Sequence, residues 1–222
     1  MDQFQSYFLQ LLEGFRSSLT IFSLTLLFSL PLGLLVAFGR MAKLAPLRVF
    51  VKFYISVMRG TPLMLQLMVV FYGPALIFGI RIGDLPFKDY RFTATIIGFV
   101  INYAAYFAEI YRGGIESIPA GQHEAGAVLG FSKAQTFIYI VLPQVLRTVL
   151  PSVTNEVITL VKDTSLAYVI AYTEMFAIAS QISSRETSIL PFFIAGGFYY
   201  VANYVVQFGM GLLEKRMAYY KR

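Results

Sequence analysis

Four polar side chains recur at helical spacing within the apolar stretch 149–173. They are Ser152, Glu156, Thr159 and Asp163. Separations of four, three and four residues align them in one stripe along a helix, with the two carboxylates roughly 10 Å apart along its axis. A carboxylate that faced lipid would cost at least about 2.5 kcal/mol, so we expect the stripe to face other helices or a water-filled cavity. The pattern predicts a substrate-binding site in which Asp163 binds an α-ammonium group or a cationic side chain.

Three further polar residues are candidates for the same substrate-binding site. Lys162 widens the stripe, and Gln66 and Asn102 lie in two other apolar stretches. Neighbouring residues of a helix point about 100° apart, so Lys162 cannot simply neutralise Asp163. An ion pair between Lys162 and an acid on another helix would instead make the stripe structural. The spacing favours cavity lining over this alternative, which stays open.

The residues that several other chemistries need are absent from the sequence. There is no cysteine for a disulfide or a thiolate, and the single His123 cannot supply the paired imidazoles of a membrane haem. Neither a G-x-x-x-x-G-K-[ST] phosphate loop nor an H-E-x-x-H zinc motif occurs. We therefore expect no catalysis, cofactor or metal in this chain, and any ATP hydrolysis in another subunit.

The composition is that of a membrane protein. Of the 222 residues, 57% are hydrophobic and only 14% are charged, against about 25% charged residues in a soluble domain. So few charges could not cover the surface of a globule of this size. A water-soluble enzyme and a disordered tail are both excluded.

The uncharged runs predict five membrane-spanning helices within one domain, 1–222. About 20 apolar residues cross a bilayer, and the run 134–146 is too short to do so. The expected spans are 17–39, 60–80, 92–111, 149–173 (despite its charges) and 189–213. Before residue 17, apolar residues at helical spacing predict either a separate amphipathic helix on the outer surface or an extension of the first span.

Most of the 18 Lys and Arg residues lie in three segments. These are 40–59, the loop 112–147 and the tail from Lys215. Cytoplasmic loops carry an excess of basic residues, so we expect the N-terminus outside, the C-terminus in the cytoplasm and an odd number of spans. The same distribution accounts for the net charge of +6 without any binding of nucleic acid.

The loop 112–147 contains a pattern of glycines, an acid and a proline. In order, it reads Glu124-Ala125-Gly126, Gly130 and, after a gap of nine residues, Ile140-Val141-Leu142-Pro143. Gly126 and Gly130 are expected to share one face of a short helix, and Pro143 to break a helix and turn the chain back towards the membrane. The pattern resembles the EAA loop of permease subunits of bacterial ABC importers. Gly126 stands where that family more often has alanine, which would soften the helix by up to about 1 kcal/mol.

Three more stretches resemble the polar amino acid branch of this family. They are Arg59-Gly60-Thr61-Pro62-Leu63, then Tyr106 with Ala108-Glu109 and Tyr111-Arg112-Gly113-Gly114-Ile115, and finally Lys162-Asp163-Thr164-Ser165-Leu166. A structural interpretation is favoured for the first stretch, with Arg59 as a membrane anchor, Thr61 as a helix cap and Pro62 in the first turn. Glu109 and Arg112, three residues apart, are expected to pair.

The resemblance implies an all-α permease of type I ABC importer architecture in the bacterial cytoplasmic membrane. It implies docking of ABC ATPase subunits, which bind ATP and Mg²⁺, on the loop 112–147. The implied coupling residues are Glu124, Ala125, Gly126, Gly130, Leu142 and Pro143. It further implies a second permease subunit, identical or different, and an extracytoplasmic binding protein that delivers a polar amino acid.

A stand-alone ion-coupled secondary transporter is the alternative function. Such transporters are commonly built from internal repeats, and none is visible among five unequal spans. A membrane enzyme is a third possibility, but no nucleophile motif lies at membrane depth. Neither of these needs a helix on which an ATPase docks, so the loop 112–147 favours the importer.

Overall fold

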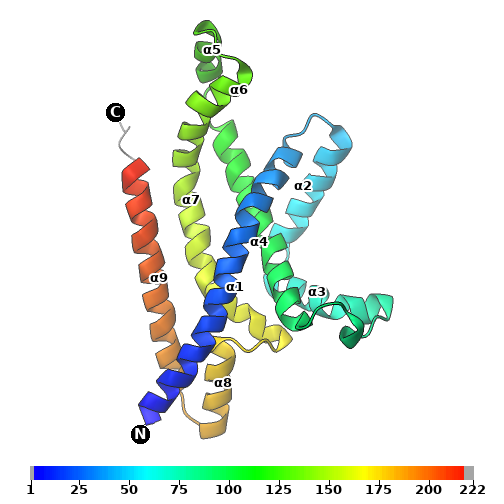
Figure 1. Ribbon diagram of the computed structural model, residues 1–222, viewed down its shortest axis with the longest axis vertical. Helices are drawn as coiled ribbons and strands as arrows, with labels where there is room; N and C mark the ends of the chain where they lie inside the picture. The colour runs from blue at the N-terminus through cyan, green and yellow to red at the C-terminus, as the bar shows by residue number, and fades with distance from the viewer. Residues whose placement is uncertain (1–2, 218–222) are drawn as a thin grey trace.

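The computed structural model describes residues 3–217, and this part of the chain contains helices and no strand (Figure 1). The α-helices are α1 (Gln3–Arg40), α2 (Ala45–Gly60), α3 (Leu63–Phe78), α4 (Tyr90–Glu116), α5 (Ala120–Val128), α6 (Lys133–Thr136), α7 (Leu142–Asp163), α8 (Met175–Glu186) and α9 (Leu190–Met217). Short 3₁₀ segments occupy Ile82–Asp84 (η1) and Thr164–Ile170 (η3), and a π-turn (η2) covers Phe137–Val141.

Helix α1 is continuous from Gln3 to Arg40 and packs along α4. The N-terminal stretch therefore extends the first long helix, which decides between the two interpretations left open above. Small residues allow the close packing: a Cβ on Gly33 would come within 2.8 Å of the Phe107 Cβ on α4. Nearer the N-terminus, a Cβ on Gly14 would come within 2.7 Å of the Met175 backbone of α8.

The predicted span 60–80 corresponds to α3 and is preceded by a further helix, α2. The helix axis bends by 111° between α2 and α3, across Thr61 and Pro62. A helix end leaves carbonyl groups without partners, and here the Gln66 amide donates to the Met58 and Thr61 carbonyls at 3.0 and 3.1 Å. Asn102 of α4 donates to the same Met58 carbonyl at 3.1 Å and to the Gln66 side-chain oxygen at 3.0 Å. Gln66 and Asn102 thus fix the bend.

The cap predicted for α3 is wrong. The N-cap residue is Pro62, which has no side-chain cap, and the Thr61 hydroxyl instead donates to the Val57 carbonyl of α2 at 2.8 Å. The Thr61 oxygen also accepts from the Gln66 amide at 2.8 Å. Thr61 therefore stabilises the end of α2, because the sharp bend places its hydroxyl beside that helix and not beside the N–H groups of α3.

Pro143 does not break its helix, contrary to the expectation from sequence. The chain runs from α6 through η2 into α7, and Pro143 lies in the first turn of α7. In the π-turn the Leu142 amide donates to the Phe137 carbonyl, five residues back. The regular i to i−4 hydrogen bonding is therefore already interrupted at the point where Pro143 has no backbone N–H to donate. The first turn of a helix tolerates proline, and the helical path continues.

After α7, the segment η3 turns the chain into α8, and α9 then runs back along α7. The Thr154 hydroxyl of α7 donates to the Glu214 carboxylate of α9 at 2.7 Å. By length and hydropathy, the stretches Gln3–Arg40, Tyr90–Glu116 and Lys133–Ile170 can cross a membrane, and the bent α2–α3 pair would make a fourth. Helix α9, over the predicted span 189–213, falls outside this set.

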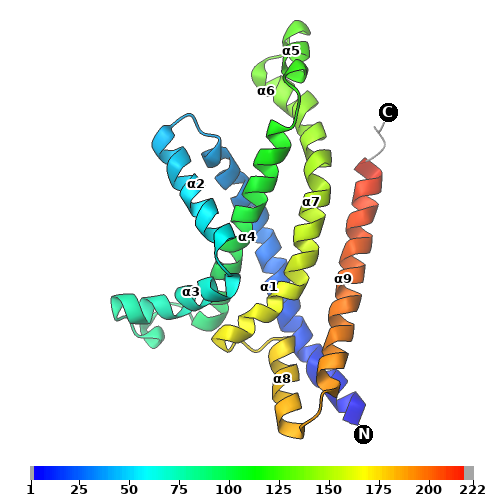
Figure 2. The ribbon, with the colours of Figure 1, turned by 180° about the vertical axis from the view of Figure 1, so that it is seen from behind.

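The two ends of the molecule differ in the elements that they bring together. In both ribbon views, the C-terminal ends of α1, α4 and α9 and the start of α2 point towards the end that carries α5 and α6, and the start of α1 and α8 lie at the other end (Figures 1 and 2). The loop 112–147, the start of the segment 40–59 and the described part of the tail, 215–217, are therefore directed towards one end, called the basic end below.

Candidate functional site

The polar stripe of α7 lies partly against α4. Asp163, the last residue of α7, accepts a 2.7 Å hydrogen bond from the hydroxyl of Tyr103, which is only 2% exposed. Glu156 and Thr159 are half-buried on the same helix, and Glu156 and Asp163 both interact electrostatically with Tyr103. The helix–helix packing thus brings the Asp163 carboxylate into contact with a buried phenol, and Glu156 lies within electrostatic range of the same phenol. Ser152, at the other end of the stripe, is exposed.

Lys162 lies within electrostatic range of Asp163 but forms no ion pair with it. Its side chain is exposed, and none of the ion pairs within residues 3–217 includes Lys162, Glu156 or Asp163. The ion pairs of that region are those of Arg112 with Glu109 and Glu116, and of Arg185 with Glu186. The expected pairing of Glu109 with Arg112 is therefore confirmed, at 2.9 Å from Nε. A structural ion pair made by Lys162 finds no support in this part of the chain.

Gln66 and Asn102 are placed apart from the stripe by their hydrogen bonds. Their amide groups bond to each other and to the backbone of the α2–α3 bend. Both side chains are buried. The structure gives them a bracing contact at the bend, whose α2 side carries Arg59.

A polar cavity of about 510 Å³ adjoins that bend, between the end of α1, α2 and α4. Its lining residues are Arg40, Lys52, Ile55, Ser56, Arg59, Gly60, Tyr106 and Glu109. The Arg59 guanidinium lies over the Tyr106 ring, 5.3 Å from the ring centre, and the Tyr106 ring lies 6.2 Å from that of Tyr103. The cavity is therefore lined by several cations. One of them, Arg59, contacts Tyr106, whose ring neighbours that of Tyr103, the hydrogen-bond donor to Asp163.

At the basic end, α5 and α6 form a hairpin, the α5–α6 hairpin (residues 120–136). Gly130 has φ +77°, a left-handed conformation that favours glycine, and the Phe131 amide bonds back to the Gly126 carbonyl at 3.0 Å. Helix α5 ends at Val128, so the expectation that Gly126 and Gly130 share one helix face is wrong. Gly130 ends the helix because its backbone can turn where other residues are strained.

Gly126 has a packing role that its effect on helix propensity did not indicate. It is buried, and a Cβ on it would come within 2.6 Å of the Thr136 side chain of α6. Ser132 and Gln135 form a reciprocal capping box that starts α6, with the Ser132 amide bonded to the Gln135 side chain at 2.8 Å. The glycine is therefore the contact that lets the two short helices close on each other.

The tip of the α5–α6 hairpin exposes apolar side chains. Val128 is 88% exposed and Leu129 69% exposed, and Phe131 is also exposed. Of the other residues implied in coupling, Glu124 and Ala125 are exposed on α5. The structure does not bring Leu142 and Pro143 to the tip; they lie half-buried in the first turn of α7.

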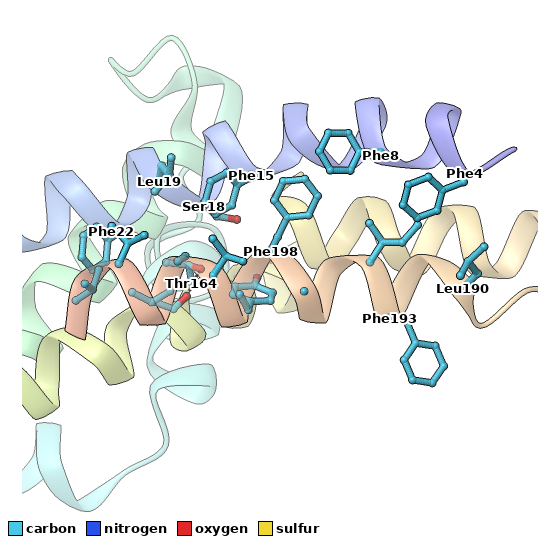
Figure 3. Close-up of a pocket in the computed structure, with 18 residues that line it drawn as sticks. Phe4, Phe8, Phe15, Ser18, Leu19, Phe22, Thr164, Leu190, Phe193 and Phe198 are labelled. Atoms are coloured by element: carbon cyan, nitrogen blue, oxygen red, sulfur yellow. Dashed lines mark hydrogen bonds between the residues drawn. The ribbon is translucent and has the colours of Figure 1, made fainter. Parts of the chain in front are cut away.

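A second cavity, about 860 Å³, is an apolar groove between α1 and α9 (Figure 3). Phe4, Phe8, Phe15 and Phe198 are among its lining residues. Figure 3 shows Phe198 pointing towards α1 and Phe193 pointing away from it, consistent with the 70% exposure of Phe193. A surface with so few polar groups does not fit a polar solute, and the aromatic residues of α9 serve packing and the apolar surface.

Sequence reasoning missed Glu174, which is fully buried before α8. Its carboxylate accepts from the Phe176 and Ala177 amides at 2.8 and 2.7 Å, and from the hydroxyls of Ser18 and Tyr199 at 3.3 and 3.2 Å. It therefore ties α8 to α1 and α9. The signal was an acid in an apolar region directly before a helical segment, but glutamate is not a usual N-cap residue.

Comparisons with known proteins agree with this geometry. The family model for the binding-protein-dependent transport system inner membrane component matches residues 29–219. The L-cystine transport system permease protein TcyB of Bacillus subtilis (strain 168) is 35% identical over 219 residues, which cover 97% of this chain and 90% of that protein. The octopine transport system permease protein OccM of Rhizobium radiobacter is 38% identical over 213 residues, covering 93% and 85%.

Solved structures match over nearly the whole chain. The crystal structure of an amino acid ABC transporter with histidines superposes with a TM-score of 0.86 at 30% identity and covers 97% of this chain and 99% of that one. An inward-facing MetNI methionine ABC transporter, at 18% identity, shares the fold with a TM-score of 0.69 and covers 98% and 99%. The chain belongs to the family of binding-protein-dependent transport system inner membrane components and is a permease subunit of an ABC importer.

Proposed function

We propose that this permease carries polar amino acids and is driven through the α5–α6 hairpin by separate ATPase subunits. The observation that carries the proposal is the exposed apolar tip of this hairpin, Val128 and Leu129, at the basic end of the molecule. Exposed apolar patches with polar surroundings mark protein contacts. A rigid hairpin directly joined to α7 can transmit a displacement into the helix that carries Glu156 and Asp163.

The orientation follows from the same end of the molecule. Cytoplasmic segments are enriched in Lys and Arg, so the basic end faces the cytoplasm, with the C-terminus there and the N-terminus outside. This arrangement takes five spans: α1, the bent α2–α3 pair, α4, α7 with η3, and α9. Helix α9 has 28 residues, enough to cross a bilayer, and polar residues such as Asn203 and Gln207 lower its hydropathy. The expected location is the bacterial cytoplasmic membrane.

The solute path is proposed to pass the stripe of α7. Glu156 and Asp163 would attract an ammonium group, with Ser152, Thr159 and Lys162 along the same helix. An intramembrane carboxylate outside the ion pairs of residues 3–217 favours a solute site over a purely structural role. The relatives named for cystine, octopine, glutamine and arginine transport support an amino acid or a closely related solute.

The remaining subunits follow from this proposal. ATPase subunits would bind ATP and Mg²⁺ and dock at the hairpin, where Glu124, Ala125, Gly126 and Gly130 form α5 and its end. A second permease, identical or different, would complete the path, and an extracytoplasmic binding protein would deliver the amino acid. Closure of the ATPases on ATP would then shift the hairpin and rock the helices between inward-open and outward-open states.

Reconstitution into vesicles tests the proposal. The chain and its ATPase subunits are reconstituted into proteoliposomes with the ATPase subunits facing the lumen, and the binding protein is added outside. Uptake of radiolabelled L-arginine, L-glutamine and L-cystine is measured with and without ATP in the lumen. Uptake of one of these amino acids is expected only with ATP and ATPase subunits present. Accumulation of an amino acid in vesicles that contain the chain alone would overturn the proposal. The absence of ATP-driven uptake for all three amino acids would overturn it as well.

A further inference from the structure

Arg59 is a cation that lies well away from the basic turn at the start of its own helix. Helix α2 begins at Ala45 and ends at Gly60, so Arg59 lies roughly 20 Å along the axis from that start. A membrane anchor would sit at the surface, in the turn before α2 that carries Lys43. The position of Arg59 at the α2–α3 bend differs from that expected of an anchor and calls for another role.

The surroundings of Arg59 connect it to the carboxylates of α7. Its guanidinium lies 5.3 Å from the centre of the Tyr106 ring, and that ring is 6.2 Å from the Tyr103 ring. Tyr103 in turn donates its 2.7 Å hydrogen bond to Asp163. Arg59 also interacts electrostatically with Glu156. Two neighbouring phenol rings therefore link Arg59 to Asp163, and Arg59 also lies within electrostatic range of Glu156.

Arg59 is not neutralised by an ion pair with a neighbouring acid. None of the ion pairs within residues 3–217 includes it. Glu109 lines the same cavity, but its carboxylate is paired with Arg112. Arg40 and Lys52 also line the cavity, which therefore has an excess of positive charge and favours an anionic group of a solute.

We propose that Arg59 binds the α-carboxylate of the transported amino acid, while Glu156 and Asp163 bind its α-ammonium group or a cationic side chain. This inference rests on the proposed function and names the second half of the same site. A guanidinium fits a carboxylate with two parallel hydrogen bonds, and stacking on Tyr106 holds its plane without neutralising it. The arrangement selects amino acids against amines that lack a carboxylate.

The test compares each amino acid with the amine that remains after loss of every α-carboxylate, one in arginine and glutamine and both in cystine. The purified permease–ATPase complex, without the binding protein, is titrated with L-arginine, L-glutamine and L-cystine. The tightest of these is then compared with its amine, which is agmatine, 4-aminobutanamide or cystamine. We expect the wild-type complex to bind the amino acid at least tenfold more tightly than the amine. Arg59→Gln is expected to reduce this ratio to about threefold or less.

Two further variants make the result specific. Arg59→Lys keeps the charge but not the paired donors, so its ratio is expected to fall between those of wild type and Arg59→Gln. It also serves if Arg59→Gln does not assemble. Arg48→Gln, a matched loss of an exposed arginine on the same helix and outside the cavity, is expected to keep the wild-type ratio.

The outcomes separate this inference from the proposed function. A wild-type ratio in Arg59→Gln, together with lost binding in Asp163→Asn, would overturn the role of Arg59 and leave the amino acid site standing. No binding of any of the three amino acids by the wild-type complex would count against the proposed function itself. A collapsed ratio in Arg59→Gln but not in Arg48→Gln supports the inference.

Discussion

The hydroxyl of Tyr103 donates a hydrogen bond to the Asp163 carboxylate across the interface between α4 and α7, at 2.7 Å. Tyr103 belongs to a buried ring cluster with Phe99 and Phe107, so its position is fixed by packing on α4. Asp163 is the last residue of α7, directly before the turn into η3. The pair therefore couples the end of one long helix to the core of another, at the proposed solute site.

Tyr103→Phe should weaken the solute site while leaving the core packed. The change removes one charge-assisted hydrogen bond, which is typically worth about 1.5–3 kcal/mol, and leaves Asp163 less well oriented. The amino acid concentration that gives half-maximal stimulation of ATP hydrolysis is expected to rise several-fold. Tyr54→Phe is the matched control, because Tyr54 donates to the Ile101 carbonyl of α4 away from Asp163. An equal rise in both variants would contradict the prediction.

Asp163→Asn should abolish most of the amino acid dependence of ATP hydrolysis. The substitution keeps the shape of the side chain but removes the charge that attracts an ammonium group. Basal ATP hydrolysis is expected to remain, because Asp163 lies far along α7 from the α5–α6 hairpin. Glu116→Gln removes an exposed carboxylate at the other end of α4 and serves as a control. Unchanged amino acid dependence in Asp163→Asn would make Asp163 structural.

Gly126→Ala should uncouple transport through a steric conflict within the hairpin. The added methyl group would come within 2.6 Å of Thr136, an overpacking that typically costs about 1–3 kcal/mol. We expect uptake to fall while the chain still inserts into the membrane. Thr136→Gly removes the side-chain atoms that clash, so the double variant should regain uptake. If the double variant is no better than Gly126→Ala, the contact is not the cause.

Leu129→Asp should prevent the ATPase subunits from binding. Leu129 is 69% exposed, so the change costs the permease little stability but places a charge in the proposed apolar contact. Co-purification of tagged permease with its ATPase subunits measures the effect. Leu44→Asp changes a similarly exposed leucine (65%) between α1 and α2, outside the hairpin, and should leave binding intact. Normal co-purification of Leu129→Asp would refute docking at the tip.

Glu174→Ala should destabilise the junction of α1, α8 and α9. The fully buried carboxylate accepts from two backbone amides and two hydroxyls, and these donors would lose this acceptor, although the Ser18 hydroxyl keeps the Gly14 carbonyl at 3.3 Å. Leaving such groups unsatisfied costs roughly 1–3 kcal/mol each before relaxation. A clear drop in the thermal unfolding temperature of the detergent-solubilised chain is expected. Glu13→Ala, at an exposed site on α1, should change it little, and an equal drop would contradict the prediction.

The membrane class, the helical architecture and the carboxylate stripe can all be predicted from the amino-acid sequence alone. Each of these depends on properties that are local in the chain: the length of uncharged runs, the distribution of basic residues and the 3.6-residue period that aligns Glu156 with Asp163. Burial in lipid makes such patterns strong, because an unpaired charge or backbone group there is costly. The motif around Glu124 is informative because it too is local, with all of its residues within one short stretch of the chain.

How distant segments of the chain meet depends on three-dimensional packing and cannot be predicted from local sequence patterns. The bend between α2 and α3 depends on Asn102 reaching the Met58 carbonyl from α4, and Glu174 gains its role from Ser18 and Tyr199 on two other helices. No window of sequence contains both partners of these contacts. Gly126 shows the same limit at short range: its propensity predicted a softer helix, whereas the close approach of Thr136 makes the missing side chain a packing requirement. Helix propensity acts along one segment, and close packing acts between segments.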